Sequence, residues 1–118
     1  MKYNRGFIAG AFDAVHPGYI AMFKDCKKNC EHLCVALHVD PSIENGKLTP
    51  VMSVEERKDI LLSLRFVDEV VCYNTEKELY ELIKTKADVR FLGDDYIGKK
   101  YTGWDLPTPI VFLSRDHG

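Results

Sequence analysis

Short apolar runs alternate along the chain with segments whose apolar residues recur at helical spacing. The runs have the length expected of buried strands and cover residues 6–10, 33–39, 67–73, 89–92 and 109–113. No repeat, linker or low-complexity tract interrupts the alternation. The pattern therefore predicts strands and helices in turn from one end of the chain to the other.

The first predicted helix begins at Pro17, a residue favoured at the first helical position because its missing N–H costs nothing there. Its apolar face follows at helical spacing and consists of Tyr19, Phe23, Cys26 and Cys30. Cys26, Cys30 and Cys34 stand at intervals of four residues, which would suit a metal site. Burial as small apolar residues is the better interpretation, because free cysteine is among the most buried residue types. We expect no structural metal.

Two further helices are predicted from capping patterns. Ser53 with Glu56 three residues later forms a capping box ahead of an apolar stripe, and Thr75 begins the same pattern. Arg57 lies inside the first of these helices, where Glu56 and Asp59 are equally good partners. It is therefore not assigned to a functional site.

Strands that alternate with helices imply right-handed crossovers and a mostly parallel sheet covered on both faces. We expect an α/β fold with a Rossmann-like, doubly wound, five-stranded sheet in three α/β/α layers, and a single domain over residues 1–118. Ligands of such sheets bind beyond the carboxyl ends of the strands. The polar residues that follow the five predicted strands are Asp13 and His16, Asp40, Asn74, Asp94 and Asp95, and Arg115, Asp116 and His117. This placement favours one shared cleft.

Composition narrows the classes of function. The 118 residues carry 16 Lys and Arg against 18 Asp and Glu, so no basic surface for nucleic acid is expected. No apolar run approaches the ~20 residues of a membrane span. The four cysteines form no CxxC pair, which suits a reducing compartment, and we expect a cytoplasmic protein.

The sharpest local feature is the segment Gly10–Tyr19, a strand-to-helix turn with two glycines and with His16 directly before Pro17. A helix start offers unpaired N–H groups and a partial positive charge that suit phosphate. An imidazole at this point can donate to a phosphate oxygen, or it can serve only as a helix cap. Physics alone does not separate the two. Neither the dinucleotide GxGxxG pattern nor the GxxxxGK[ST] phosphate loop occurs.

The turn Gly10–Tyr19 resembles the GxFDxxHxGH motif of the HxGH-type nucleotidyltransferase superfamily, and in particular its cytidylyltransferase branch of the glycerol-3-phosphate type. Four further segments resemble motifs of that branch in the same order, namely Lys47 with Pro50–Arg57, Leu64–Val70, Gly93–Lys99 and Ser114–Gly118. One such motif would be a weak match. Five in register across the whole chain are a strong one.

The resemblance implies roles for individual residues. The implied catalytic residues are His16, Tyr19, Lys47 and Arg115, with His16 as the donor to the phosphate of the nucleoside triphosphate. The implied nucleotide-binding residues are Gly10, Ala11, Phe12, Asp13, Arg65 and Asp94. Among them, Asp13 is expected to fix the turn rather than to transfer a proton, and Asp95 is expected to be a turn residue.

This sequence departs from the family motifs at two places. Tyr19 stands where the family has its second histidine, and a phenol carries no positive charge near neutral pH. The chain ends at Gly118, where the family continues into a Ser-Thr segment that helps to hold the phosphates. We therefore expect a domain that lacks the family's last segment.

The resemblance implies the reaction as well. A substrate phosphate would attack the α-phosphorus of CTP, with magnesium carried by the triphosphate, to form a CDP-linked product of a small phosphorylated alcohol. A homodimer is implied by the family alone. Two alternatives stay open: an adenylyltransferase of the same superfamily, and a nucleotide-binding module whose catalysis is impaired.

Overall fold

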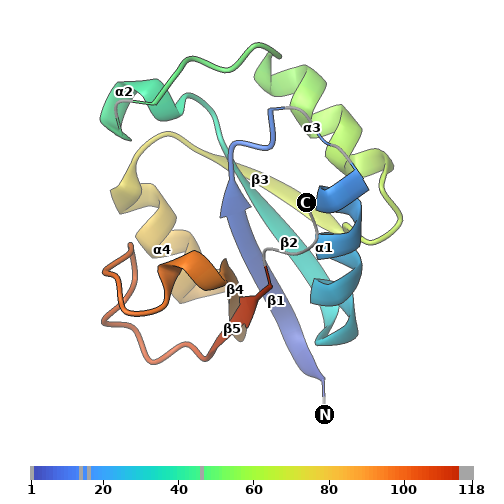
Figure 1. Cartoon of the computed structure of the whole chain (residues 1–118), viewed down its shortest axis with the longest axis vertical. Helices are drawn as coiled ribbons and strands as arrows, with labels where there is room; N and C mark the ends of the chain where they lie inside the picture. The colour runs from blue at the N-terminus through green and yellow to red at the C-terminus, as the bar shows by residue number, and fades with distance from the viewer. Residues whose placement is uncertain (1, 14, 16, 46, 115–118) are drawn as a thin grey trace.

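Five parallel strands form one sheet in the order β3-β2-β1-β4-β5 (Figure 1). The computed structural model describes residues 2–13, 15, 17–45 and 47–114. The strands are β1 (Tyr3–Gly10), β2 (Cys30–His38), β3 (Glu69–Tyr73), β4 (Val89–Gly93) and β5 (Ile110–Leu113). The order runs outward from β1 in both directions, so the chain reverses its course between β1 and β4. The expected five-stranded, doubly wound sheet is confirmed and is parallel throughout.

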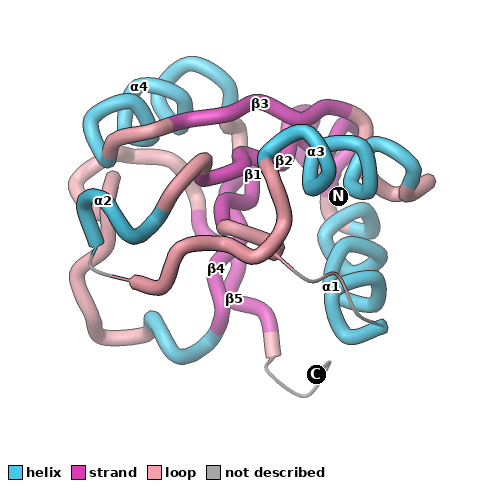
Figure 2. Tube along the Cα trace, turned by 90° about the horizontal axis from the view of Figure 1, so that it is seen from above, coloured by secondary structure: helices cyan, strands magenta, loops and turns pink. Residues whose placement is uncertain are grey.

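Helices cover both faces of the sheet, so the three-layer prediction is also confirmed. On one face lie α1 (Pro17–Lys28) and α3 (Val54–Ser63), and on the other lies α4 (Glu76–Lys86) (Figures 1 and 2). A short helix α2 (Pro41–Asn45) and a 3₁₀ turn η1 (Asp94–Tyr96) follow β2 and β4. Both lie beyond the carboxyl ends of their strands, where polar side chains gather.

The two apolar layers follow from the alternation of side chains along β1 and β2. Phe7 and Cys34 face α4 and pack with its Leu79 and Ile83, whereas Ile8 faces the other helices. The second layer joins Phe23 and Cys26 of α1 and Leu61 of α3 to the side chains of β2 and β4. Two packed layers hold the central strand on both faces and leave its carboxyl end as the place where a ligand can reach it.

Both predicted helix caps are present. The Ser53 hydroxyl accepts the Glu56 N–H at 3.1 Å, and the Glu56 carboxylate accepts the Ser53 N–H at 3.0 Å, which completes the capping box of α3. At α4 the Thr75 hydroxyl accepts the Glu78 N–H at 3.1 Å. Local sequence chemistry thus fixes where both helices begin.

The prediction that Cys30 belongs to the first helix is wrong. Helix α1 ends at Lys28, and the Asn29 carbonyl accepts the Tyr3 N–H at 2.8 Å, so the chain joins the sheet and Cys30 begins β2. Cys26, Cys30 and Cys34 are all buried, as expected, and burial raises the pKa of Cys34 to about 12. These thiols therefore pack as apolar groups. Across the described residues, no helix is both long and apolar enough to cross a bilayer.

Candidate active site

Two cavities flank the carboxyl end of β1. The α1-side cavity, of about 520 Å³, lies between this strand end, the start of α1 and the ends of β4 and β5. The α4-side cavity, of about 650 Å³, lies on the other face of the sheet, below the ends of β1 and β2. Their common wall consists of Ala9, Gly10, Ala11, Leu92 and Tyr96. Both cavities open at the reversal between β1 and β4, where sheets of this type bind ligands.

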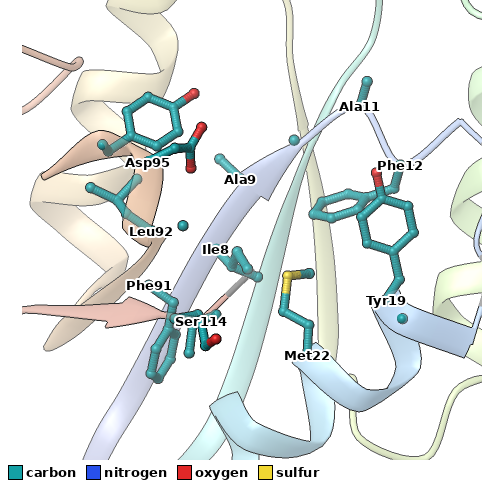
Figure 3. Close-up of a pocket in the computed structure, with 15 residues that line it drawn as sticks. Ile8, Ala9, Ala11, Phe12, Tyr19, Met22, Phe91, Leu92, Asp95 and Ser114 are labelled. Atoms are coloured by element: carbon teal, nitrogen blue, oxygen red, sulfur yellow. The ribbon is translucent and has the colours of Figure 1, made fainter. Parts of the chain in front are cut away.

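The turn after β1 shapes the α1-side cavity. Phe12 has a positive φ of 45° and is buried, and its ring meets Tyr19 edge-on at a centroid distance of 5.4 Å (Figure 3). A Cβ at position 10 would lie 3.0 Å from that ring, tighter than ordinary contact, so glycine fits where a larger residue would push Phe12 outward. Gly10, Ala11, Phe12 and Tyr19 all line this cavity.

Asp13 braces the loop that precedes α3. Its carboxylate accepts the backbone N–H groups of Met52 and Val51, each at 2.8 Å. These hydrogen bonds, with that from Met52 the stronger, lower the pKa of Asp13 against a smaller opposing effect of burial. A carboxylate that is held ionised in this way fixes the position of the loop and has little tendency to carry a proton at neutral pH.

Arg57 is a central residue that the sequence analysis left out. Its side chain is only 2% exposed and forms no pair with Glu56 or Asp59 among the contacts of the described residues. Its guanidinium instead donates to five backbone carbonyls, those of Ala11, His38, Val39, Met52 and Ser53. Arg57 thus ties the ends of β1 and β2 to the start of α3. The partners are up to 46 residues away in sequence, so no local pattern could have revealed them.

Lys47 lines the α4-side cavity, opposite the cavity that holds Tyr19. Asp95 lines the α1-side cavity and lies across it from Phe12 and Tyr19, whereas Asp94 does not line it (Figure 3). The family resemblance implied Asp94 as the nucleotide-binding residue of this pair. Both residues stand in the 3₁₀ turn η1, and of the three residues of this turn Asp95 and Tyr96 line the cavity.

Arg65 lines neither of the two cavities. It follows the end of α3 at Ser63 and precedes the start of β3 at Glu69, and its exposed guanidinium lies 4.9 Å from the Phe66 ring centre. In a parallel sheet the amino ends of the strands lie at the edge opposite the carboxyl ends. The role of Arg65 in nucleotide binding stays a prediction. His16 and Arg115, two predicted catalytic residues, lie outside the described residues.

A comparison with known families decides the identity of this arrangement. The sequence model described as cytidylyltransferase-like matches residues 7–106. The chain belongs to this cytidylyltransferase-like family. The family predicted from the sequence motifs is therefore confirmed. The matched range contains the turn after β1, the wall that the two cavities share and the loop that Asp13 holds.

Several curated relatives of this cytidylyltransferase-like chain carry the name bifunctional protein HldE. The protein from Campylobacter fetus is 39% identical over 110 residues, which are 91% of this chain and 24% of the relative. The protein from Hyphomonas neptunium is 33% identical over 103 residues, which are 86% of this chain and 21% of the relative. The chain therefore spans between about a fifth and a quarter of the length of these relatives.

A solved structure shares the fold of this cytidylyltransferase-like chain. The lipopolysaccharide core biosynthesis protein from Thermoplasma volcanium superposes with a TM-score of 0.74 at 23% identity and covers 94% of both chains. At that identity the similarity supports the architecture alone. The site must be argued from this chain's own residues.

The Asp13 brace can be tested directly. We expect Asp13→Asn to weaken nucleotide binding about tenfold, since the amide loses the charge and one acceptor oxygen and the loop before α3 shifts. Nucleotide affinity by calorimetry measures the effect, with Asp59→Asn on the exposed face of α3 as the matched control.

The pH dependence of this brace follows from the sign of the shift. Because the folded pKa of Asp13 is lowered, its contribution is complete above the ordinary aspartate pKa of about 4 and is lost only as pH falls through the lowered value. Wild-type affinity should not vary on account of Asp13 between about pH 5 and pH 8. An unchanged affinity in Asp13→Asn would contradict the bracing role.

Proposed function

We propose that the chain transfers a cytidylyl group from CTP to a small phosphorylated alcohol of the glycerol 3-phosphate type and releases pyrophosphate. The observation that carries this proposal is the shared wall of the two cavities at the end of β1. A nucleotide in the α1-side cavity and an acceptor phosphate in the α4-side cavity would meet above Gly10 and Ala11. Holding two reactants in this relation is the main requirement of an in-line transfer.

The α1-side cavity suits a nucleoside triphosphate. Its wall combines apolar side chains such as Ile8 and Met22 with the first turn of α1, where Gly18 and Tyr19 line it. The amino end of a twelve-residue helix provides N–H groups and partial positive charge for phosphate oxygens. The Tyr19 hydroxyl is a further hydrogen-bond donor at this end.

The proposed step needs no nucleophile from the protein. An oxygen of the acceptor phosphate forms a bond to the α-phosphorus of CTP, while the bond from that phosphorus to the bridging oxygen of the β-phosphate breaks and pyrophosphate leaves. Catalysis then consists of positioning and charge stabilisation. Lys47 would hold the acceptor phosphate in the α4-side cavity, and His16, Tyr19 and Arg115 would hold the triphosphate.

Magnesium would enter this site with the triphosphate. Magnesium keeps several waters and binds proteins through one or two carboxylates together with substrate phosphates. Asp95 places a carboxylate on the wall of the α1-side cavity, which fits that mode of binding. Within the described ranges no group of three or more His, Cys, Asp or Glu side chains could hold a metal ion. The ion would neutralise charge on the phosphates.

Pyrophosphate release tests the proposal. CTP and ATP should each be assayed with glycerol 3-phosphate, with other polyol and amino-alcohol phosphates and with sugar phosphates. We expect release with CTP and a polyol phosphate, and a CDP-linked product by mass spectrometry. Release with ATP alone would overturn the choice of nucleotide. If CTP bound but no acceptor gave turnover, the chain would instead be a nucleotide-binding module whose catalysis is impaired.

Adenylyl transfer to a sugar phosphate is the second candidate. The specific observation in its favour is that the curated relatives described above are HldE proteins rather than glycerol-phosphate enzymes. The segments Gly93–Lys99 and Leu64–Val70 favour the cytidylyl branch, which is why CTP stands first. A homodimer, expected from the family, stays a prediction that light scattering can test.

Tyr19 offers a separate test of the phosphate-binding end of α1. We expect Tyr19→His to raise kcat about tenfold, since a protonated imidazole adds charge where the phenol supplies only a hydrogen bond. Tyr19→Phe is the matched control, because it keeps the ring that packs on Phe12 and loses the hydroxyl. That control should lower kcat. A fall in kcat for Tyr19→His would show instead that the tyrosine is adapted to its substrate.

A further inference from the structure

Two arginines among the described residues are buried, Arg57 and Arg90, and they differ in their hydrogen bonds. Arg57 donates to five carbonyls, whereas Arg90, on β4 and only 4% exposed, donates from Nη1 to the carbonyl of Thr102. The Nε of Arg90 is buried and has no hydrogen-bond partner. Among the described residues Arg90 also forms no ion pair, and its guanidinium lies 5.3 Å from the Tyr101 ring centre.

Arg90 lies deep in the α4-side cavity. It lines that cavity and stands three residues before the end of β4 at Gly93, so its backbone is roughly 10 Å below the carboxyl edge of the sheet. The register pairs it with Phe7, whose side chain packs against α4 on the same face. The exposed Lys47 lines the same cavity from the loop that follows α2. One cation therefore lies at depth and another near the rim.

A second buried polar group shares this cavity. His38 ends β2, is 4% exposed and stacks on Tyr73 with 4.5 Å between ring centres. Its Nε2 is buried and has no hydrogen-bond partner. His38 and Arg90 both line the α4-side cavity, so two buried and incompletely satisfied side chains face the same space. Buried polar groups are normally satisfied, and exceptions at the wall of a cavity mark atoms that a bound ligand can satisfy.

The charge on the cavity wall indicates which ligand. Lys47, Arg90 and Lys100 supply three cations, and Glu76 is the single carboxylate among the lining residues described. Burying a guanidinium without a carboxylate partner costs free energy, because few protein groups take the place of the water molecules that solvated the charge. Lys47 would suffice for the phosphate that attacks the nucleotide. Arg90 is then left for another negative group.

We propose, on the basis of the proposed function, that the acceptor carries a second anionic group, a carboxylate or a further phosphate, and that Arg90 binds it. The planar guanidinium of arginine matches both groups. His38 completes this end of the cavity as a second polar contact. The acceptor is thus a phosphorylated alcohol acid or a bisphosphate, and a polyol phosphate that carries no second anionic group is the poorer substrate.

Matched ligands test the proposal by calorimetry without nucleotide. 3-Phosphoglycerate and glycerol 3-phosphate differ by a carboxylate, and fructose 1,6-bisphosphate and fructose 6-phosphate differ by a phosphate. For at least one pair we expect the doubly anionic member to bind about tenfold tighter or more. Arg90→Gln should abolish that difference, Arg90→Lys should restore part of it, and Arg5→Gln, a surface arginine paired with Asp88, should not change it.

Each outcome bears on one proposal or on both. Equal binding within both pairs by the wild-type chain overturns the role of Arg90, even where the Arg90 variants fail to fold. Selective binding that survives Arg90→Gln in a folded variant, judged by circular dichroism, overturns it too. Arg90-dependent selectivity without pyrophosphate release overturns the proposed transfer and leaves the anion site standing. Binding of none of the four compounds overturns the role of Arg90, and the pyrophosphate assay then decides the proposed transfer separately.

Discussion

Replacing Arg57 with methionine is expected to lower the free energy of unfolding by about 3–5 kcal/mol, a large fraction of the stability of a domain of this size. The guanidinium is 2% exposed and donates to five carbonyls, three of them at 2.6 to 2.9 Å. Methionine fills a similar space and donates no hydrogen bond, so buried carbonyls at the ends of β1 and β2 would be left unsatisfied. Urea unfolding followed by circular dichroism measures the loss.

Two variants make this test specific. Lys58→Met removes a cation from the exposed face of the same helix and should change stability by less than about 0.5 kcal/mol. Arg57→Lys keeps the charge but cannot reach five carbonyls, so its stability should fall between those of the wild type and Arg57→Met. If Arg57→Met lowered the free energy of unfolding by less than about 1 kcal/mol, water would be taking the place of the guanidinium, and Arg57 would not be a main source of stability.

The same variant should affect the site. One carbonyl bound by Arg57 belongs to Ala11, which lines both cavities, and another belongs to His38. Arg57 touches these residues through their backbone and lines neither cavity itself. It is therefore a positioning residue. Its hydrogen bonds stabilise the fold and also hold the wall that nucleotide and acceptor would share.

Local chemistry explains what the sequence predicted well. The caps at Ser53 and Thr75 depend on residues three positions apart, and both formed as expected. Alternating strands and helices constrain the sheet to be parallel, because a right-handed crossover brings each new strand back in the same direction. The order of the strands depends on pairings between distant segments, and periodicity carries no information about it.

Errors arose where contacts over long sequence distances decide. Cys30 continues the helical spacing of α1, but the sheet takes it because the preceding residue pairs with Tyr3. Arg57 and Arg90 are the same residue type, and only the fold shows that one is saturated by carbonyls and the other opens into a cavity.

The candidate site divides in the same way. Gly10 and Phe12 could be assigned from the motif, because a tight strand-to-helix turn needs such residues wherever it occurs. Asp94 and Asp95 are adjacent in sequence, and only the folded chain shows that Asp95 lines the α1-side cavity. The α4-side cavity was not foreseen as a separate feature, since its walls come from seven elements spread over most of the chain.

Replacing His16 with alanine is expected to lower kcat by about 100- to 1,000-fold and to leave the stability of the fold unchanged. In sequence His16 stands directly before Pro17, the first residue of α1, whose first turn lines the α1-side cavity. A donor at that point would stabilise charge that grows on the phosphates during transfer and is weaker in the ground state. The effect should therefore appear in kcat more than in the KM for CTP.

A histidine at the other edge of the sheet provides the control. His32 pairs with Glu69 at 3.0 Å near the amino end of β3, so His32→Ala should leave turnover within about twofold of the wild type. His16→Asn, which keeps a neutral donor, should recover part of the lost kcat. Turnover of His16→Ala within tenfold of the wild type would show that Tyr19, Lys47 and the helix terminus carry the transition state without it. A rise in KM at unchanged kcat would make His16 a binding residue only.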